Sequence, residues 1–157
     1  LAVRDGGRLL RRRLHLAFET IAAKPCQLAG HHQRLVEHTH EARFGKRLHF
    51  EINVAPELGQ IAVPPFALQT LVENSIKHVI SQRREGGQIF VKVESEGDHV
   101  KLSVGDNGNG VDLATIPNGR GLDNLQARLY ALFGHQAALE FKRQENYAIA
   151  SISLPRQ

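Results

Sequence analysis

Apolar residues recur at helical spacing in four parts of the chain. Residues 4–23 and 28–42 each carry an apolar stripe separated by polar positions. A third stripe follows Pro64 and Pro65, and a fourth runs from about 122 to 133. Proline is tolerated in the first turn of a helix, so the proline pair predicts a helix beginning there. The pattern therefore predicts four helices.

Strand-like alternation of apolar and polar residues occurs in five segments, namely 47–54, 88–95, 99–106, 137–144 and 147–155. Glu96-Gly97-Asp98 and Glu145-Asn146 are turn sequences, so each should close a hairpin. Helices lead the chain, and most strands follow with one helix between them. This order predicts an α/β (α+β) two-layer sandwich, with helices packed on one face of a mixed, mostly antiparallel sheet.

The composition changes this picture little. The chain has 157 residues, of which 41% are apolar and 23% charged, as in one soluble globular domain. No stretch approaches the roughly 20 apolar residues that a membrane helix needs. Cys26 is the single cysteine, so no disulfide can form within the chain, which favours a reducing compartment. Methionine is absent even at position 1, and we therefore expect a piece of a longer protein.

The net charge of +4 is unevenly distributed, because five arginines fall within the first thirteen residues. Such a cluster can bind a phosphate backbone. The intervening Leu9, Leu10, Leu14 and Phe18 have helical spacing, which favours the solvated side of an amphipathic helix. No aromatic platform or recognised reader motif accompanies the arginines, so we expect no nucleic-acid partner.

Several common catalytic motifs are missing. The sequence contains no P-loop, no HExxH metal helix and no GxSxG nucleophile motif. The glycine pairs lack the third glycine of a dinucleotide fingerprint. His31, His32, His38 and His40 cluster in the sequence, but zinc sites need a closed set of three or four ligands, so a solvated helix face is favoured.

The helix predicted after the prolines carries polar residues suited to a metal-phosphate site. Glu73, Asn74, Lys77 and His78 alternate with core positions in this segment. A neutral amide oxygen such as that of Asn74 can complete the octahedral shell of Mg²⁺. Lys77 could form a charge-assisted hydrogen bond to phosphate, and His78 shares the face of Asn74 and could border a base. The alternative is an ordinary solvated helix face.

Two glycine pairs follow downstream. Asp106 ends a strand in "DNGNG", where its carboxylate could accept a hydrogen bond from an exocyclic amine such as that of adenine. Gly108 and Gly110 would let the backbone approach a flat ring, although this motif taken alone favours a plain Asn-Gly turn. Gly119 and Gly121 precede a helix, where free amides favour anions. A flexible loop capped by Asp123 or Asn124 is the alternative there.

The order of these parts resembles the GHKL ATPase superfamily. "LVENSIKH", "DNGNG" and "GRGL" correspond to its N, G1 and G2 boxes. More narrowly, residues 63–80 and 119–134 resemble the catalytic domain of LytS-type sensor histidine kinases, and the resemblance covers roughly residues 28–154. It implies the Bergerat (GHKL) fold, ATP and Mg²⁺ as cofactors, and an ATP lid around 111–121.

The resemblance and the residue chemistry together give a defined set of expected site residues. Asn74 would hold Mg²⁺ and Asp106 would contact adenine. Glu73 and Asn74 are the catalytic candidates. The expected nucleotide-binding residues are Asn74, Lys77, His78, Asp106, Gly108, Gly110, Gly119, Gly121 and Leu122.

One position separates the branches of this superfamily. Its gyrase-like, mismatch-repair and chaperone members place a water-polarising glutamate four residues before the metal asparagine, where this chain has Thr70. Glu73 would project about 100° away from Asn74 around the helix. The usual base for water is thus missing, which favours phosphoryl transfer to a separate acceptor.

The acceptor histidine of LytS-type kinases lies in a Pro-His-Phe context that is absent here. His15, in "RLHLAF", is a weak alternative. We therefore expect residues 1–27 to be a helical segment that follows a missing dimerisation and phosphoacceptor region, and residues 28–157 to be the catalytic domain.

The resemblance implies a protein-histidine kinase domain of a two-component system, inactive by itself. Its expected partners are its own acceptor helix, a response regulator and, in the parent protein, a second copy. The parent would be anchored at the inner or plasma membrane with this portion in the cytoplasm. Two alternatives stay open: a non-catalytic, anti-sigma-like interaction module that binds nucleotide, and a hydrolytic ATPase.

Overall fold

The fold is known from a computed structural model of the chain. The residues that it describes are 48–58, 61, 63–64, 67–82, 85–108 and 120–156. The two N-terminal helices, the arginine cluster, the histidine cluster and the proposed domain boundary at residue 28 all lie outside these residues. Those expectations stay predictions.

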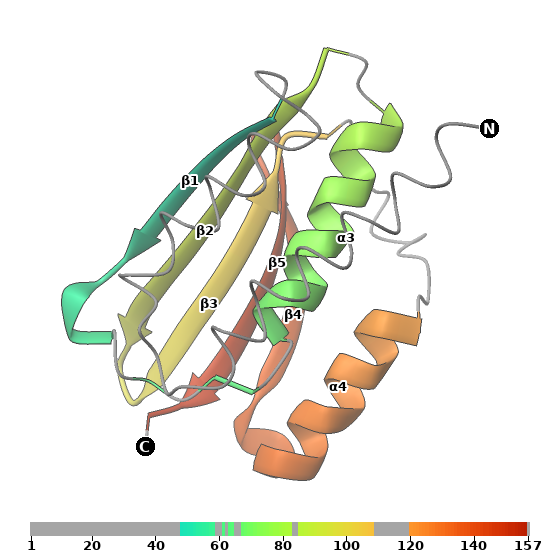
Figure 1. Cartoon of the computed structure of the whole chain (residues 1–157). Coiled ribbons are helices and arrows are strands. Elements are labelled where there is room, and N and C mark those ends of the chain that lie inside the picture. The colour runs from blue at the N-terminus through green and yellow to red at the C-terminus, as the bar shows by residue number, and fades with distance from the viewer. Residues whose placement is uncertain are drawn as a thin grey trace.

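The described strands form one twisted sheet (Figure 1). Their bounds are β1 Leu48–Val54, β2 Gly87–Glu96, β3 His99–Asp106, β4 Ala138–Gln144 and β5 Tyr147–Pro155. The strand order is β1-β2-β3-β5-β4. β1 pairs with β2 in parallel, and the remaining pairs are antiparallel. The prediction of a mixed, mostly antiparallel sheet is confirmed.

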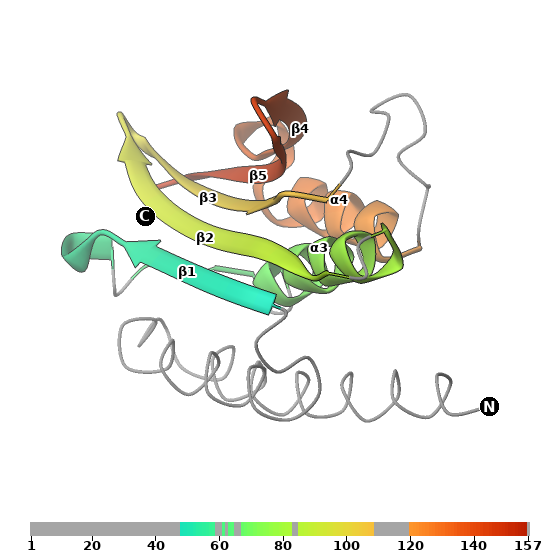
Figure 2. The same cartoon turned by 90° about the horizontal axis from the view of Figure 1, so that it is seen from above.

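Two helices cover one face of this sheet. Helix α3 spans Ala67–Gln82 and helix α4 spans Arg120–Phe133, with short 3-10 turns at Pro56–Leu58 (η3) and Gly134–Gln136 (η5). Seen from above, both helices lie on the same side of the sheet (Figure 2). Because β1 and β2 run parallel, the chain must cross over between them, and α3 forms part of that crossover.

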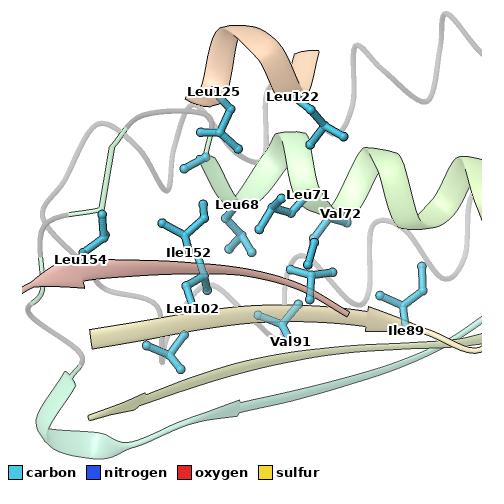
Figure 3. Close-up of a cluster of buried hydrophobic side chains, with 14 of the residues drawn as sticks. Leu68, Leu71, Val72, Ile89, Val91, Leu102, Leu122, Leu125, Ile152 and Leu154 are labelled. Atoms are coloured by element: carbon cyan, nitrogen blue, oxygen red, sulfur yellow. The ribbon is translucent and has the colours of Figure 1, made fainter. Parts of the chain in front are cut away.

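The core lies between the two layers (Figure 3). Leu71 and Val72 of α3 are fully buried, and they face sheet residues such as Val91 and Leu102, each 1% exposed. Complete burial of one such side chain contributes about 1.5–3 kcal/mol. The apolar stripe of α3 is thus held against the sheet, and the opposite, polar side of the helix remains for other contacts.

Strand alternation decides which side chains enter this core. On β2, Ile89, Val91 and Val93 are buried, whereas Gln88 and Lys92, on the opposite face, are exposed. Successive side chains of a strand point to opposite faces, so the register of a strand fixes its whole apolar set at once. The same rule carries Asp106 at the end of β3 to the face of Leu102 and Val104, which is the face that the helices cover.

One helix boundary differs from the expectation. We expected a helix from about residue 122, but α4 begins at Arg120. Gly121 therefore lies within the first helical turn instead of preceding it. The first four backbone N–H groups of a helix have no partner within the helix, so Gly121 can still present a free N–H there.

Candidate functional site

Asp106 joins the sheet to helix α3. It is the last residue of β3, and only 3% of it is exposed. Its carboxylate is hydrogen-bonded to the side chain of Ser75 on α3. The backbone N–H of Gly108 donates to Asp106 Oδ1 at 3.1 Å. Ser75 of the N box and Asp106 of the G1 box, which are 31 positions apart in sequence, therefore meet at this carboxylate.

Burial controls the protonation of Asp106. It raises the pKa of this carboxyl above its ordinary value, because a charge is poorly solvated inside the protein. The hydrogen bonds from Ser75 and Gly108 and the nearby His78 act in the opposite direction. A buried acceptor such as this carboxylate meets few competing water molecules. A hydrogen-bond donor on a ligand that reaches it therefore forms a strong and well-oriented hydrogen bond.

His78 lies on the same side of α3 as this carboxylate. It is half-buried, and burial lowers the pKa of its imidazole. The negative charge of Asp106 opposes this shift, and the adjacent Lys77 reinforces it. The imidazole is therefore held toward its neutral form, in which it can border a flat ring without adding a cation.

The remaining polar residues of the N box spread over the solvated side of α3. Asn74 is half-buried and lies one turn before His78, so the two share a face. Lys77 is exposed. Glu73 is half-buried, and its Oε1 accepts a hydrogen bond of 2.8 Å from Nε2 of Gln69. The helix thus presents an amide, an imidazole, a cation and a carboxylate in different directions.

The third box reaches α3 from helix α4. A Cβ atom built on Gly121 would lie 3.5 Å from Cγ2 of Thr70, one turn before Asn74. Leu122 is 7% exposed and belongs to the core, with its side chain directed toward α3 (Figure 3). Gly110 and Gly119 lie outside the described residues. The start of α4 therefore lies beside α3 at the residue that precedes the N box.

Asn107 fixes the turn that follows Asp106. Its Oδ1 accepts a hydrogen bond of 2.7 Å from the backbone N–H of Gln88, and its own N–H donates to the Gln88 carbonyl at 3.2 Å. A Cβ atom built on Gly87 would lie 2.6 Å from both Asn107 Oδ1 and Val79 Cγ1. The start of β2, the turn after Asp106 and helix α3 therefore approach one another only because residue 87 is glycine.

Sequence reasoning did not single out three residues that build this arrangement. Ser75 occupies a buried position of α3 and supplies the hydrogen bond to Asp106. Asn107 was considered only as part of an Asn-Gly turn, and no role in the site was considered for Gly87. A buried serine among apolar helix residues was a signal that could have been used. The role of Gly87 had no local signal, because it depends on a distant valine.

The described residues contain no group of three or more histidine, cysteine, aspartate or glutamate side chains that could hold a metal ion. No helix in the described part of the chain is long and apolar enough to cross a membrane.

Residues 65–150 match the family described as histidine kinase-, DNA gyrase B- and HSP90-like ATPases. The sensor histidine kinase/phosphatase LytS of Staphylococcus aureus is 38% identical over 115 residues, covering 65% of this chain and 20% of LytS. The chain thus spans about a fifth of the length of this curated relative.

Solved structures share the fold at low sequence identity. The histidine kinase domain of a blue-light-activated histidine kinase from Erythrobacter litoralis superposes with a TM-score of 0.60 at 18% identity, covering 82% of this chain and 64% of that one. Full-length ShkA in complex with AMPPNP gives a TM-score of 0.60 at 20% identity, covering 98% and 37%.

Proposed function

The chain belongs to the family of histidine kinase-, DNA gyrase B- and HSP90-like ATPases, and from this premise we propose that it is the ATP-binding catalytic domain of a two-component sensor histidine kinase. One observation carries the proposal. Ser75 of the N box is hydrogen-bonded to Asp106 of the G1 box, and Thr70, the residue just before the N box, lies next to Gly121 of the G2 box.

Asp106 would recognise the base. Its carboxylate accepts hydrogen bonds only, so it favours a purine that presents an exocyclic amine, as adenine does. His78 would border the ring in its neutral form. The glycines at 108, 110, 119 and 121 would let backbone amides lie close to the nucleotide, with residues 111–121 as a lid and Leu122 anchoring the start of α4 in the core.

Asn74 and Lys77 would hold the phosphates. A single amide oxygen is a weak metal site alone, but Mg²⁺ commonly takes one or two protein ligands and completes its octahedron with water and substrate phosphates. The half-buried Asn74, without a cage of carboxylates among the described residues, fits Mg²⁺ held in this manner. Bound Mg²⁺ would neutralise the developing phosphate charge, and the exposed Lys77 would add a cation.

Transfer to a histidine is favoured over hydrolysis because Thr70 replaces the usual water-polarising glutamate. The acceptor histidine would lie on a helix outside this chain, and a response regulator would take the phosphoryl group from it. The 38% identity to LytS supports this assignment. We further propose a homodimeric parent protein anchored in the membrane, with this domain in the cytoplasm.

Nucleotide binding is tested by Asp106→Asn. The variant keeps the shape of the side chain but presents a neutral amide to the base, and a hydrogen bond to a charged group contributes about 1.5–3 kcal/mol. Calorimetry should show roughly a 10- to 100-fold weaker affinity for ATP with Mg²⁺. Asp98→Asn, in the exposed β2–β3 turn, is the matched control and should bind ATP normally. Equal affinities in the two variants would refute the assignment of Asp106.

Kinase activity is tested by adding a fragment that carries the upstream acceptor helix. Labelled ATP should then yield acid-labile phosphohistidine on that fragment, and the chain alone should release little phosphate. Tight ATP binding without transfer would instead support an interaction module. Steady phosphate release by the chain alone would support a hydrolytic ATPase.

A further inference from the structure

Gln69 is a buried polar residue that the site described above does not use. It lies in the first turn of α3, and it is 8% exposed. Its Nε2 donates to Glu73 Oε1 at 2.8 Å, one helical turn further along. Its Oε1 is buried and accepts no hydrogen bond within the described part of the chain.

The orientation of this amide follows from the chemistry of Glu73. An ionised carboxylate can only accept hydrogen bonds, so the NH₂ group of Gln69 must face it and the amide oxygen must turn inward. A buried acceptor without a partner costs about 1–3 kcal/mol, whereas leucine at this position would leave no orphaned group. Stability alone therefore does not favour glutamine here.

The bond to Gln69 occupies one of the two oxygens of Glu73. The other, Oε2, accepts no hydrogen bond from the residues that the structure describes. Glu73 is half-buried and adjoins Asn74, from which it projects about 100° around the helix. A group approaching the phosphates from that side would meet a carboxylate with a fixed position and one available oxygen.

We propose that Gln69 is a positioning residue that holds the carboxylate of Glu73 as proton acceptor for the acceptor histidine. The inference rests on the proposed kinase function. In the step, one ring nitrogen of the neutral imidazole forms the N–P bond with the γ-phosphorus. The bond from the γ-phosphorus to the β,γ-bridging oxygen breaks, and its electron pair leaves with ADP. The proton on the other ring nitrogen passes to Oε2 of Glu73.

Gln69→Leu separates this role from a structural one. The substitution removes the donor and also the orphaned oxygen, so the urea midpoint should stay equal or rise. ATP affinity should stay within about twofold, because Gln69 lies off the face of Asn74 and His78. The rate of phosphohistidine formation, measured in the kinase that carries its acceptor helix, should fall about tenfold, since a misplaced catalytic group loses orientation.

Glu73→Gln provides the second arm. Its amide oxygen can still accept from Gln69, so folding and ATP binding should persist, while the rate should fall roughly 100-fold because the proton acceptor is gone. The double variant should be no slower than Glu73→Gln alone, because Gln69 acts only through Glu73. Glu57→Gln, which removes an exposed carboxylate in η3, is the charge-matched control and should react at the wild-type rate.

The outcomes separate the two hypotheses. If the wild-type kinase binds ATP and forms phosphohistidine but Gln69→Leu reacts at the same rate, the positioning role is wrong and the kinase function stands. The same holds if Gln69→Leu unfolds at lower urea with no loss of rate in the folded protein, or if the two substitutions slow the reaction independently. If the wild-type protein forms no phosphohistidine, both proposals fail.

Discussion

Asp106 and His78 show how burial sets the chemistry of individual residues. Burial raises the pKa of the Asp106 carboxyl and lowers that of the His78 imidazole, so each group is pushed toward its neutral form. Each also attenuates the shift of the other, because opposite charges attract. The protonation of these two side chains therefore makes the stability of the unliganded protein depend on pH.

Acidification should destabilise the protein through His78. The ordinary imidazole pKa is 6.5, and it is lowered in the folded state. Below pH 6.5 the imidazole of His78 therefore binds a proton more readily in the unfolded chain than in the folded chain. The contribution of His78 to the free energy of unfolding is thus present above that pH and is lost as pH falls. Urea unfolding between pH 8 and 5 should show a smaller loss for His78→Gln than for wild type. His135→Gln, at an exposed position, should follow the wild-type curve, and identical curves for all three proteins would contradict the prediction.

At the scale of elements, the site forms where the start of β2, the end of β3 and helix α3 approach closely. Asn107 bonds Gln88 through both its side chain and its backbone, which ties the turn after Asp106 to the neighbouring strand. Gly87 allows this approach, because a Cβ atom there would meet Asn107 and Val79. Packing of backbone against the helix thus places Asp106 opposite Ser75.

Gly87→Ala should disturb both folding and binding. The new methyl group would lie 2.6 Å from Val79 Cγ1, in the core, and from Asn107 Oδ1, so the helix or the turn must shift. Overpacking of this kind costs about 1–3 kcal/mol in the free energy of unfolding, measurable by urea titration. Folded Gly87→Ala should also bind ATP more weakly in calorimetry.

Gly97→Ala is a useful comparison for that experiment. Gly97 has a φ of 63°, so alanine there is strained, but apart from its two chain neighbours no residue in the described part of the chain comes within 4 Å of its Cβ position. The Gly97→Ala variant should have a lower free energy of unfolding but an unchanged affinity for ATP. If Gly87→Ala bound ATP as tightly as Gly97→Ala does, the proposed link between residue 87 and the site would be wrong.

At the scale of the whole molecule, the two-layer architecture leaves one side of α3 uncovered by the sheet, and this is the side where we propose that the nucleotide binds. The apolar stripe of α3 is committed to the sheet, and Leu122 and Leu125 hold α4 beside it (Figure 3). The proposed ligand would contact elements from three parts of the chain, so it should stabilise the folded state as a unit. Binding energy would then appear as resistance to unfolding.

ATP with Mg²⁺ should raise the melting temperature. At a ligand concentration of about 100 times Kd, the stabilisation is about 2.7 kcal/mol. For a domain of this size that corresponds to roughly 5–10 °C, since each kcal/mol shifts Tm by about 2–4 °C. GTP should give a smaller shift, because guanine presents an oxygen where adenine has its amine and would face the acceptor Asp106. Equal shifts with ATP and GTP, or the same ATP shift in Asp106→Asn, would contradict this assignment.

The sequence alone predicted the two helices on the sheet, the strands and both hairpins, because apolar spacing records which face of each element is buried. It also selected Asp106 and the N-box residues as site candidates, since their order along the chain carries the family pattern, and their roles stay predictions. The start of α4 was predicted at about residue 122, whereas the helix begins at Arg120. This difference shows the limit of local signals, because a glycine at residue 121 favours a break although the helix includes it.

Only the tertiary structure decided the parallel pairing of β1 with β2, the Ser75–Asp106 hydrogen bond and the close approach at Gly87. Each depends on groups that are distant in sequence, and periodicity carries no information about which distant partner a residue meets. The burial of Gln69 belongs to the same class. From the sequence, an amide side chain at the start of a helix is expected to be exposed to solvent. Its burial depends on which other parts of the fold pack over it.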